Sequence, residues 1–247
     1  MKLDYIYHSG FAIEADGITV IIDYYKDSSE EAPDRGIVHD HLLKKPRTLY
    51  VLSSHFHPDH FNRDILSWKE QRPDIRYIFS KDILKHRRAT AEDAVYINKG
   101  DVYEDENIRI EAFGSTDVGI SFLIDLQGVR LFHAGDLNWW HWLGDTDENN
   151  RFAREYARKE FNRVQGMKAD VVMFPVDARL EAAREWGSIE FLHHVEQPKL
   201  FVPMHANGPI WEPSIYFKAL YEDLPLWIPQ HDGDTTDLKP YETAQQG

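Results

Sequence analysis

The chain has 247 residues, and its 28 Lys and Arg against 42 Asp and Glu give a formal charge of −14. It contains no Cys, which excludes disulfides, thiolate-bound zinc, iron–sulfur clusters and a cysteine nucleophile. The acidic balance disfavours non-specific binding to nucleic acid or to anionic membranes, because like charges repel at long range.

The first half of the chain predicts short strands joined by turns. Apolar or alternating runs indicate strands at 3–7, 11–15, 18–23, 48–52 and 75–80. Asp16-Gly17 is a hairpin signal, and an acidic loop with Pro33 as a breaker follows the third strand. Helices are expected over 62–71, which Asn62 can cap, and over 81–88.

The second half repeats this alternation. Strands are expected at 107–113, 119–126, 129–133, 169–175 and 199–203. Helices are expected at 149–165, 187–196 and 213–222. Two rounds of strands followed by helices predict two packed sheets with helices outside. Since no linker or composition shift marks a boundary, we expect a single domain over residues 1–247.

The location of the protein is predicted from what the sequence lacks. No apolar run approaches the roughly 20 residues that cross a bilayer. The N-terminus has no apolar region of the kind found in signal peptides. We therefore expect a cytoplasmic protein without a membrane partner.

The chemistry-bearing residues concentrate in a polar segment that follows the strand predicted at 48–52. His55, His57, Asp59 and His60 fall within six positions, and imidazole and carboxylate are good ligands for zinc and similar cations. In an extended segment His55, His57 and Asp59 share one side, while a turn lets His60 reach a second position. The spacing suits two neighbouring metals better than one. The alternative is a histidine-rich surface loop.

Three further candidates lie at strand ends. Asp136 follows Gly135, which permits a sharp turn, and its carboxylate could bridge two cations. A turn residue or helix cap is the alternative for Asp136. His205 follows the strand at 199–203 and could instead be a structural histidine. Asp117 lies in a segment typical of a turn.

The motif and these strand ends together resemble the metallo-β-lactamase-fold hydrolase superfamily, in the style of its lactonase-like branch, which includes ascorbate-6-phosphate lactonases. The residues that carry the resemblance, in order, are His55, His57, Asp59, His60, Asp136 and His205. The opening His8-Ser9-Gly10-Phe11 is also similar to the first hairpin of that superfamily. The resemblance implies an αββα sandwich of two mixed β-sheets flanked by helices, with metals at one edge.

The resemblance also implies ligands for two divalent cations. The implied sets are His55 and His57 for the first metal, Asp59, His60 and His205 for the second, and Asp136 as a bridge. The family usually adds another His to the first metal, and this chain offers Asp117 there instead. We expect Zn²⁺, with Mn²⁺ or iron as alternatives, because an Asp in place of a His makes the site harder.

These residues predict a metal-dependent hydrolase that uses a metal-bridged hydroxide on a small ester, lactone or phosphate ester. Coordination lowers the pKa of water from about 15.7 to roughly 7, and Asp59 could orient the nucleophile and accept its proton. The alternatives are a nuclease of the same superfamily, which the charge disfavours, and a di-iron oxidoreductase, whose relatives usually carry Glu at His57. A non-catalytic metal-binding protein is a further alternative, which Asp117 keeps open.

Several residues are candidates for substrate binding or for plain structural roles. Trp140, His141 and Trp142 follow Asp136 and could line a pocket or pack as core. His8 could face the site or be structural.

Three further features could bear on substrate or partners. His133, like His8, could face the site or be structural. Asp177 and Arg179 could reach the site or form a simple salt bridge. A basic stripe, Arg151, Arg154, Arg158 and Lys159, could hold a phosphate-bearing substrate or be a solvated helix face. The expected partner is a small-molecule substrate, and the aromatic content leaves room for a homo-oligomer.

Overall fold

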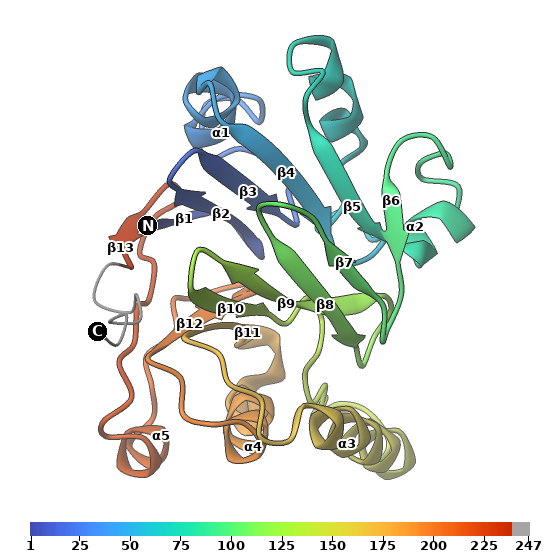
Figure 1. The fold of residues 1–247 in the computed structure, drawn as a ribbon. Coiled ribbons are helices and arrows are strands. Elements are labelled where there is room, and N and C mark those ends of the chain that lie inside the picture. Colours follow the sequence, from blue (N-terminus) through green and yellow to red (C-terminus); the bar gives the residue numbers. More distant parts are fainter. Residues whose placement is uncertain (239–247) are drawn as a thin grey trace.

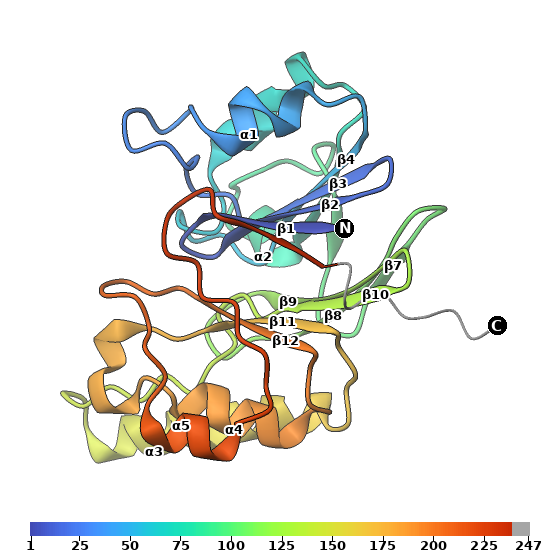
Figure 2. The ribbon, with the colours of Figure 1, turned by 90° about the vertical axis from the view of Figure 1, so that its left-hand side faces the viewer.

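The layers of the protein run helix, sheet, sheet, helix (Figure 1). The computed structural model describes residues 1–238. One sheet is covered by α3 (Asp147–Phe161), α4 (Trp186–His194) and α5 (Ile215–Leu220), and α1 (Ile37–Asp40) lies on the far side of the other sheet (Figure 2). This arrangement confirms the expected αββα sandwich.

The first sheet has seven strands in the order β13-β1-β2-β3-β4-β5-β6. Their bounds are β1 Lys2–Tyr7, β2 Gly10–Ala15, β3 Ile18–Ile22, β4 Thr48–Ser53, β5 Arg76–Ser80, β6 Val95–Ile97 and β13 Thr235–Asp237. The pairs from β13 to β3 are antiparallel and those from β3 to β6 are parallel, so the sheet is mixed. The predicted turn between β2 and β3 forms, with Gly17 at a φ of 67° that favours glycine.

The second sheet has six strands in the order β12-β11-β10-β9-β8-β7. Their bounds are β7 Val102–Glu104, β8 Arg109–Gly114, β9 Ile120–Leu126, β10 Val129–His133, β11 Val171–Pro175 and β12 Leu200–Met204. The strands β10, β11 and β12 are parallel, and the others pair antiparallel. Gln127 and Gly128 both have positive φ, which is the conformation of a tight two-residue hairpin turn between β9 and β10.

The helices differ in detail from the sequence prediction. The α2 helix covers Lys81–Lys85, and four 3₁₀ helices are η1 Leu42–Lys44, η2 Arg63–Glu70, η3 Asn162–Val164 and η4 Ala178–Ala183. The segment expected as a helix at 62–71 is therefore 3₁₀, although the Asn62 side chain caps it as predicted by accepting from the Asp64 amide. The α3 helix begins two residues before the expected start, because Thr146 is its cap.

Two apolar cores hold the layers together. The larger lies between the sheets and extends to the helices below the second sheet, where Phe161, Phe174 and Phe191 are fully buried. The smaller fills the space between the first sheet and its outer helices, around Phe61 and Trp68. Full burial of each such side chain contributes roughly 1.5–3 kcal/mol. The sheets therefore form a rigid base for the loops that leave them.

Those loops meet at one edge of the sandwich. The strands β3 and β4 run parallel in the first sheet, and β10, β11 and β12 run parallel in the second. Parallel strands end at the same edge of a sheet, so the polar residues that follow them gather there. The segments after β4, β10 and β12 carry the candidate ligands.

Candidate metal centre

The histidine motif leaves β4 in a buried, hydrogen-bonded conformation. Asp23, directly after β3, accepts from the Ser54 amide at 2.7 Å and from the Ser54 hydroxyl at 2.6 Å. The Phe56 amide donates to the Asp82 carboxylate of α2 at 2.9 Å. Neighbouring elements thus hold the backbone on both sides of His55, which keeps the imidazoles in fixed directions.

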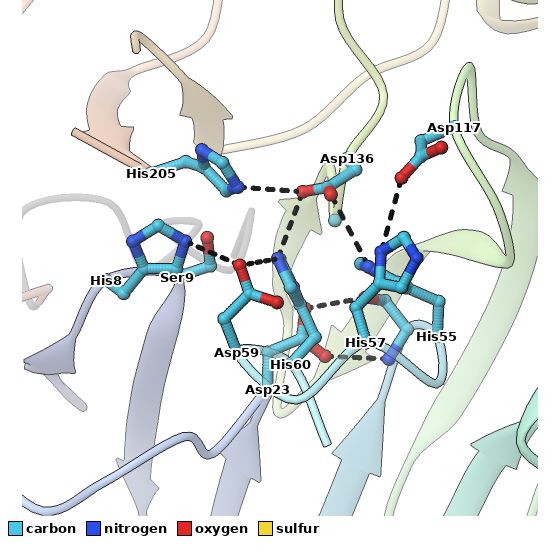
Figure 3. Close-up of polar contacts among 12 residues, drawn as sticks. His8, Ser9, Asp23, His55, His57, Asp59, His60, Asp117, Asp136 and His205 are labelled. Carbon is cyan, nitrogen blue, oxygen red and sulfur yellow. Dashed lines mark hydrogen bonds and ion pairs between the residues drawn. The ribbon is translucent and has the colours of Figure 1, made fainter. Parts of the chain in front are cut away.

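The first group of candidate ligands is His55, His57, Asp117 and Asp136. Their ligand atoms all lie within 4.8 Å of one another. His55 Nε2 lies 3.4 Å from Asp136 Oδ2, and His57 Nδ1 lies 3.3 Å from Asp117 Oδ2 (Figure 3). The structure therefore brings Asp117, from the β8–β9 turn, to the place where the resemblance expects another ligand.

The second group is His8, Asp59, His60 and His205, again with ligand atoms within 4.8 Å of one another. His8 Nε2 lies 3.4 Å from Asp59 Oδ2, and the His8 and His205 rings are 4.1 Å apart. The sequence prediction gave His8 a substrate-binding role. That role stays a prediction, and the β1–β2 turn adds His8 to the candidate ligands because it places the imidazole among them.

Asp136 lies between the two groups (Figure 3). Its Oδ2 faces His55 in the first group, while its Oδ1 lies 3.1 Å from His60 Nε2 and 3.5 Å from His205 Nε2 in the second. A carboxylate with one oxygen toward each group has the geometry that a bridging ligand needs. The ligand role of Asp136, like those of the other seven residues, is a prediction that the geometry fits.

Two buried carboxylates outside these groups orient the imidazoles. Asp23 Oδ2 lies 2.8 Å from His60 Nδ1, and Asp177 Oδ2 lies 3.0 Å from His205 Nδ1. In both histidines this leaves Nε2 directed at Asp136. Metal-binding histidines commonly use their second nitrogen in this way, which fixes the tautomer and the ring. Sequence reasoning missed the role of Asp23, although its place at a strand end was a signal.

Burial and neighbouring charges set the protonation of the site. Burial, with the nearby His60, lowers the pKa of His55 to about 3, so its imidazole is neutral. Burial opposes the charged form of Asp136, but the adjacent His60 and His205 outweigh it and hold the pKa of that carboxyl well below its usual range. The carboxylates Asp136 and Asp23 outweigh burial at His60 and raise its pKa. The site therefore combines ionised carboxylates with closely packed imidazoles.

Several polar atoms of the site are buried and have no hydrogen-bond partner among the described residues. They include Nε2 of His8, His55 and His60 and Oδ1 of Asp136. A buried polar atom without a partner costs roughly 1–3 kcal/mol. Such atoms occur in both ligand groups, and they fit bound cations, which would accept these lone pairs.

The backbone is strained at three places around the site. His8, Asp23 and His205 have φ values of 59°, 49° and 57°, in the left-handed region that non-glycine residues rarely adopt. Such strain costs on the order of 1–3 kcal/mol per residue and concentrates at functional sites. Each of the three follows a strand, and the left-handed turn directs its side chain into the site.

A cavity of about 490 Å³ opens above the candidate ligands. Its described lining includes Asp59, Asp117, Asp136, Trp140 and Trp142. The two Trp rings stack at 6.1 Å with an interplanar angle of 9°. The prediction of an aromatic wall after Asp136 therefore fits the placement of both tryptophans.

His141 is a correction to that prediction. It is not among the described residues that line the cavity. Its ring instead lies 4.6 Å from the ring of Trp186 and 6.1 Å from that of Trp139. The His141 amide donates to the Trp139 carbonyl oxygen at 2.9 Å, so the backbone makes a tight turn there, and the His141 ring packs with Trp139 and Trp186 and not with Trp140 and Trp142.

The remaining candidates take structural positions. His133 is fully buried and its Nε2 lies 2.8 Å from the Ser9 carbonyl oxygen, which joins β10 to the β1–β2 turn. Arg179 forms the expected salt bridge with Asp177 at 2.6 Å and also lines the cavity.

The basic stripe of α3 does not face the cavity. None of its residues, Arg151, Arg154, Arg158 and Lys159, is among the described residues of the cavity lining. Arg158 pairs with Glu190 at 2.9 Å. No helix within residues 1–238 is long and apolar enough to cross a membrane.

Comparison with known proteins agrees with this fold. A family model described as a beta-lactamase superfamily domain matches residues 2–149. The chain therefore belongs to the beta-lactamase superfamily, which confirms the resemblance to metallo-β-lactamase-fold proteins. The metallo-β-lactamase fold protein YhfI of Bacillus subtilis has a similar structure, with a TM-score of 0.61, 11% identity and coverage of 95% of this chain and 98% of that one.

Two relatives match most of the chain in sequence. A UPF0173 protein of Pyrococcus furiosus is 25% identical over 250 residues, which cover 98% of each chain. A protein of Desulforamulus reducens, named a UPF0173 metal-dependent hydrolase, is 23% identical over 240 residues and covers 89% of this chain and 92% of its own. Neither comparison singles out the lactonase-like branch.

Proposed function

We propose that this protein is a metal-dependent hydrolase of a small ester, lactone or phosphate ester. The observation that carries the proposal is the pair of ligand groups on either side of Asp136, which contribute five residues to the lining of a 490 Å³ cavity: His57, Asp59, Asp117, Asp136 and His205. The name of the Desulforamulus reducens relative, a metal-dependent hydrolase, supports the same reaction class. The donor set fits divalent cations, since it consists of imidazole nitrogen and carboxylate oxygen.

Each group would hold one cation. His55, His57 and Asp117 would bind the first, and Asp136 would be shared with the second group of His8, Asp59, His60 and His205. We propose Zn²⁺ as the metal. Mn²⁺ and iron are alternatives for the first position, because Asp117 replaces a softer imidazole.

The cations and the protein side chains would contribute different parts of the reaction. When bound, the cations would lower the pKa of water to about 7 and polarise the oxygen of the reacting group. Asp59 lines the cavity, and its carboxylate can accept a proton from the attacking water. Burial opposes its ionisation, but the His8 imidazole, whose Nε2 lies 3.4 Å from Oδ2, outweighs burial and lowers the pKa of Asp59, so the carboxylate is ionised at neutral pH.

The test combines metal analysis with a substrate screen. The purified protein is analysed for zinc, manganese and iron, and the loaded protein is assayed on carboxylic esters, lactones, phosphomonoesters and phosphodiesters. Asp59→Asn should lower kcat by at least 100-fold, within the range that a general base contributes. The matched control is Asp145→Asn, since Asp145 lines the same cavity outside both ligand groups and should keep most of the activity.

The screen also separates the other candidates. Bound metal without turnover of any substrate would contradict the hydrolase and favour a non-catalytic metal-binding protein. Activity confined to phosphodiesters would favour a nuclease of the same superfamily, against the expectation from a net charge of −14.

A further inference from the structure

One face of α3 forms part of the cavity wall. Asn149, Phe152, Ala153 and Tyr156 line the cavity, and their spacing of three and four residues places them on one side of the helix. The Phe152 side chain is 68% exposed, and its ring lies 5.9 Å from that of Tyr156. Phe152 therefore contributes little to the core and presents an apolar surface to whatever enters the cavity.

Another part of the cavity wall is aromatic as well, and hydrogen bonds hold it in place. Trp140 Nε1 donates to the Asp136 carbonyl oxygen at 2.9 Å. The backbone of Trp142 is fixed by the Asn150 side chain, which accepts from its amide at 2.9 Å and donates to its carbonyl oxygen at 2.7 Å. A wall that is already ordered loses little entropy when a ligand binds against it.

The outer part of the cavity offers no unpaired cation among the described lining residues. Arg179 lines the cavity, but its guanidinium donates to both oxygens of Asp177, to Oδ1 at 3.1 Å and to Oδ2 at 2.6 Å. Asp145 adds a carboxylate that belongs to neither ligand group. The basic residues of α3 lie outside the lining, so an anionic substituent would meet a negative charge and apolar rings there.

We propose that the substrate carries an uncharged aryl or alkyl group beside its reacting bond, and that Phe152 and Trp142 select this group. This inference rests on the proposed hydrolase and narrows its substrates to uncharged apolar esters or lactones. Substrates with a phosphate or carboxylate on that side are disfavoured, because Asp145 repels them and the guanidinium of Arg179 is already paired with Asp177.

The test uses two series of substrates that share a reacting bond and differ in one substituent. The esters are methyl propanoate, methyl 3-phenylpropanoate and monomethyl succinate. The lactones are γ-butyrolactone and its γ-benzyl and γ-carboxymethyl derivatives. With the metal-loaded protein we expect kcat/KM for the aryl compound to exceed that of the unsubstituted one by about tenfold, and the carboxylate compound to be the slowest.

The variants assign this preference to residues. Phe152→Ala and Trp142→Ala should each lower the ratio of kcat/KM for the aryl compound to kcat/KM for the unsubstituted compound at least fivefold. Tyr216→Ala is the matched control, because Tyr216 is 65% exposed on α5 and lies outside the described cavity lining. Equal rates across a series, a faster carboxylate compound, or an aryl preference that survives both variants would overturn the inference.

A binding measurement separates this inference from the proposed reaction. Saturation-transfer NMR on the metal-loaded protein compares 4-phenylbutan-2-one with 4-oxopentanoate, which match the ester series but resist hydrolysis. Binding of the phenyl ketone alone, weakened by Phe152→Ala, supports the apolar subsite even if no ester or lactone is turned over. Preferred binding of 4-oxopentanoate, or no binding of the phenyl ketone, contradicts it whether or not hydrolysis occurs.

Discussion

Asp177 shows how a residue that is not a candidate ligand can control the metal centre. It is fully buried, and its Oδ2 lies 3.0 Å from His205 Nδ1 while the same carboxylate binds Arg179. Burial opposes its ionisation, but the hydrogen bonds from His205 and Arg179 lower the pKa of Asp177, so it carries a charge at neutral pH. That charge fixes which nitrogen of His205 faces Asp136.

We expect Asp177→Asn to weaken metal binding by about 10–100-fold, because an amide can present its NH₂ group to His205 Nδ1 and release the ring. Competition with a chelator of known affinity measures the change. Asp125→Asn is a suitable control, since Asp125 pairs with Arg130 at 2.7 Å on β9 and lies outside both ligand groups. Unchanged affinity in the Asp177 variant would show that His205 is oriented by other contacts.

The candidate site was predictable where the local motif carries the chemistry, and less so where distant turns do. His55, His57, Asp59 and His60 stand together in the sequence, and the structure brings Asp117, Asp136 and His205 to them. His8 and Asp23 depend on positive φ values, which nothing in their own residue types announces. Sequence reasoning did not single out Phe152, which has charged neighbours along α3, because the packing of a helix decides which of its sides faces a cavity.

The β8–β9 turn approaches the histidine motif so closely that one position admits only glycine. Gly119 has a φ of 75°, and a Cβ there would lie 2.1 Å from the Ser54 carbonyl oxygen and 2.5 Å from His55 Cβ. The two sheets meet at this contact, where the Ile120 amide donates to the Ser54 carbonyl oxygen at 3.0 Å. The turn that carries Asp117 is thus fixed against the turn that carries His55.

Gly119→Ala should lower the free energy of unfolding by at least roughly 1–3 kcal/mol and should also weaken metal binding, because the turn must move away from His55. Urea unfolding and metal titration measure the two effects. Gly100→Ala is the matched control, since Gly100 also has a positive φ of 88° but no atom within 4 Å of the added Cβ. Equal effects of the two substitutions would mean that backbone strain, and not the close contact, decides the outcome.

A polar network joins the two sheets away from the ligand groups. The Asp105 carboxylate accepts from Tyr50 of β4 at 2.8 Å, from Arg76 of β5 at 2.7 Å and from Tyr103 of β7 at 2.6 Å. Burial opposes the charge, but these donors and the Asn107 amide outweigh it and lower the pKa of Asp105 to about 2. The carboxyl is therefore more acidic in the folded protein than its ordinary value of 3.8.

This shift predicts a pH-dependent contribution to stability. Between pH 4 and pH 2 the unfolded chain takes up more protons at Asp105 than the folded protein does, so its stabilising contribution is complete above about pH 4 and is lost as the pH falls. The difference in unfolding free energy between the wild type and Asp105→Asn, measured by urea unfolding of metal-free protein, should narrow from pH 6 to pH 3. A constant difference over this range would contradict the assignment.

The main strands and helices were predictable because each has a clear period or a clear turn signal. The short strands β6, β7 and β13 were missed, since three residues are too few to show an alternation, and they form only because longer neighbours offer a free edge. The expected helix at 62–71 became 3₁₀, which shares its cap and its apolar side with an α-helix. The sequence pattern therefore predicted the two sheets and their helices, whereas tertiary contacts decided the short edge strands and the type of helix at 62–71.

The protein as a whole should depend on its metals for stability. Cations that bind only the folded state raise the free energy of unfolding by about 2.7 kcal/mol per site at a hundredfold excess over Kd. Chelator-treated protein should therefore unfold at lower urea concentration than protein resupplied with Zn²⁺. His205→Ala should lose part of this gain and the exposed His231→Ala none of it; an identical gain in both would place the metal elsewhere.

The candidate ligands are divided between the two sheets, and this has a consequence for biosynthesis. The β1–β2 turn and the segment after β4 supply His8, His55, His57, Asp59 and His60, whereas Asp117, Asp136 and His205 come from the other sheet. A ribosome delivers the chain from its N-terminus, so an emerging polypeptide has a partial first group early and no complete second group until residue 205 is free. The second of the two proposed groups could therefore coordinate a cation fully only after residue 205 has left the ribosome, which would make metal acquisition a late step in folding.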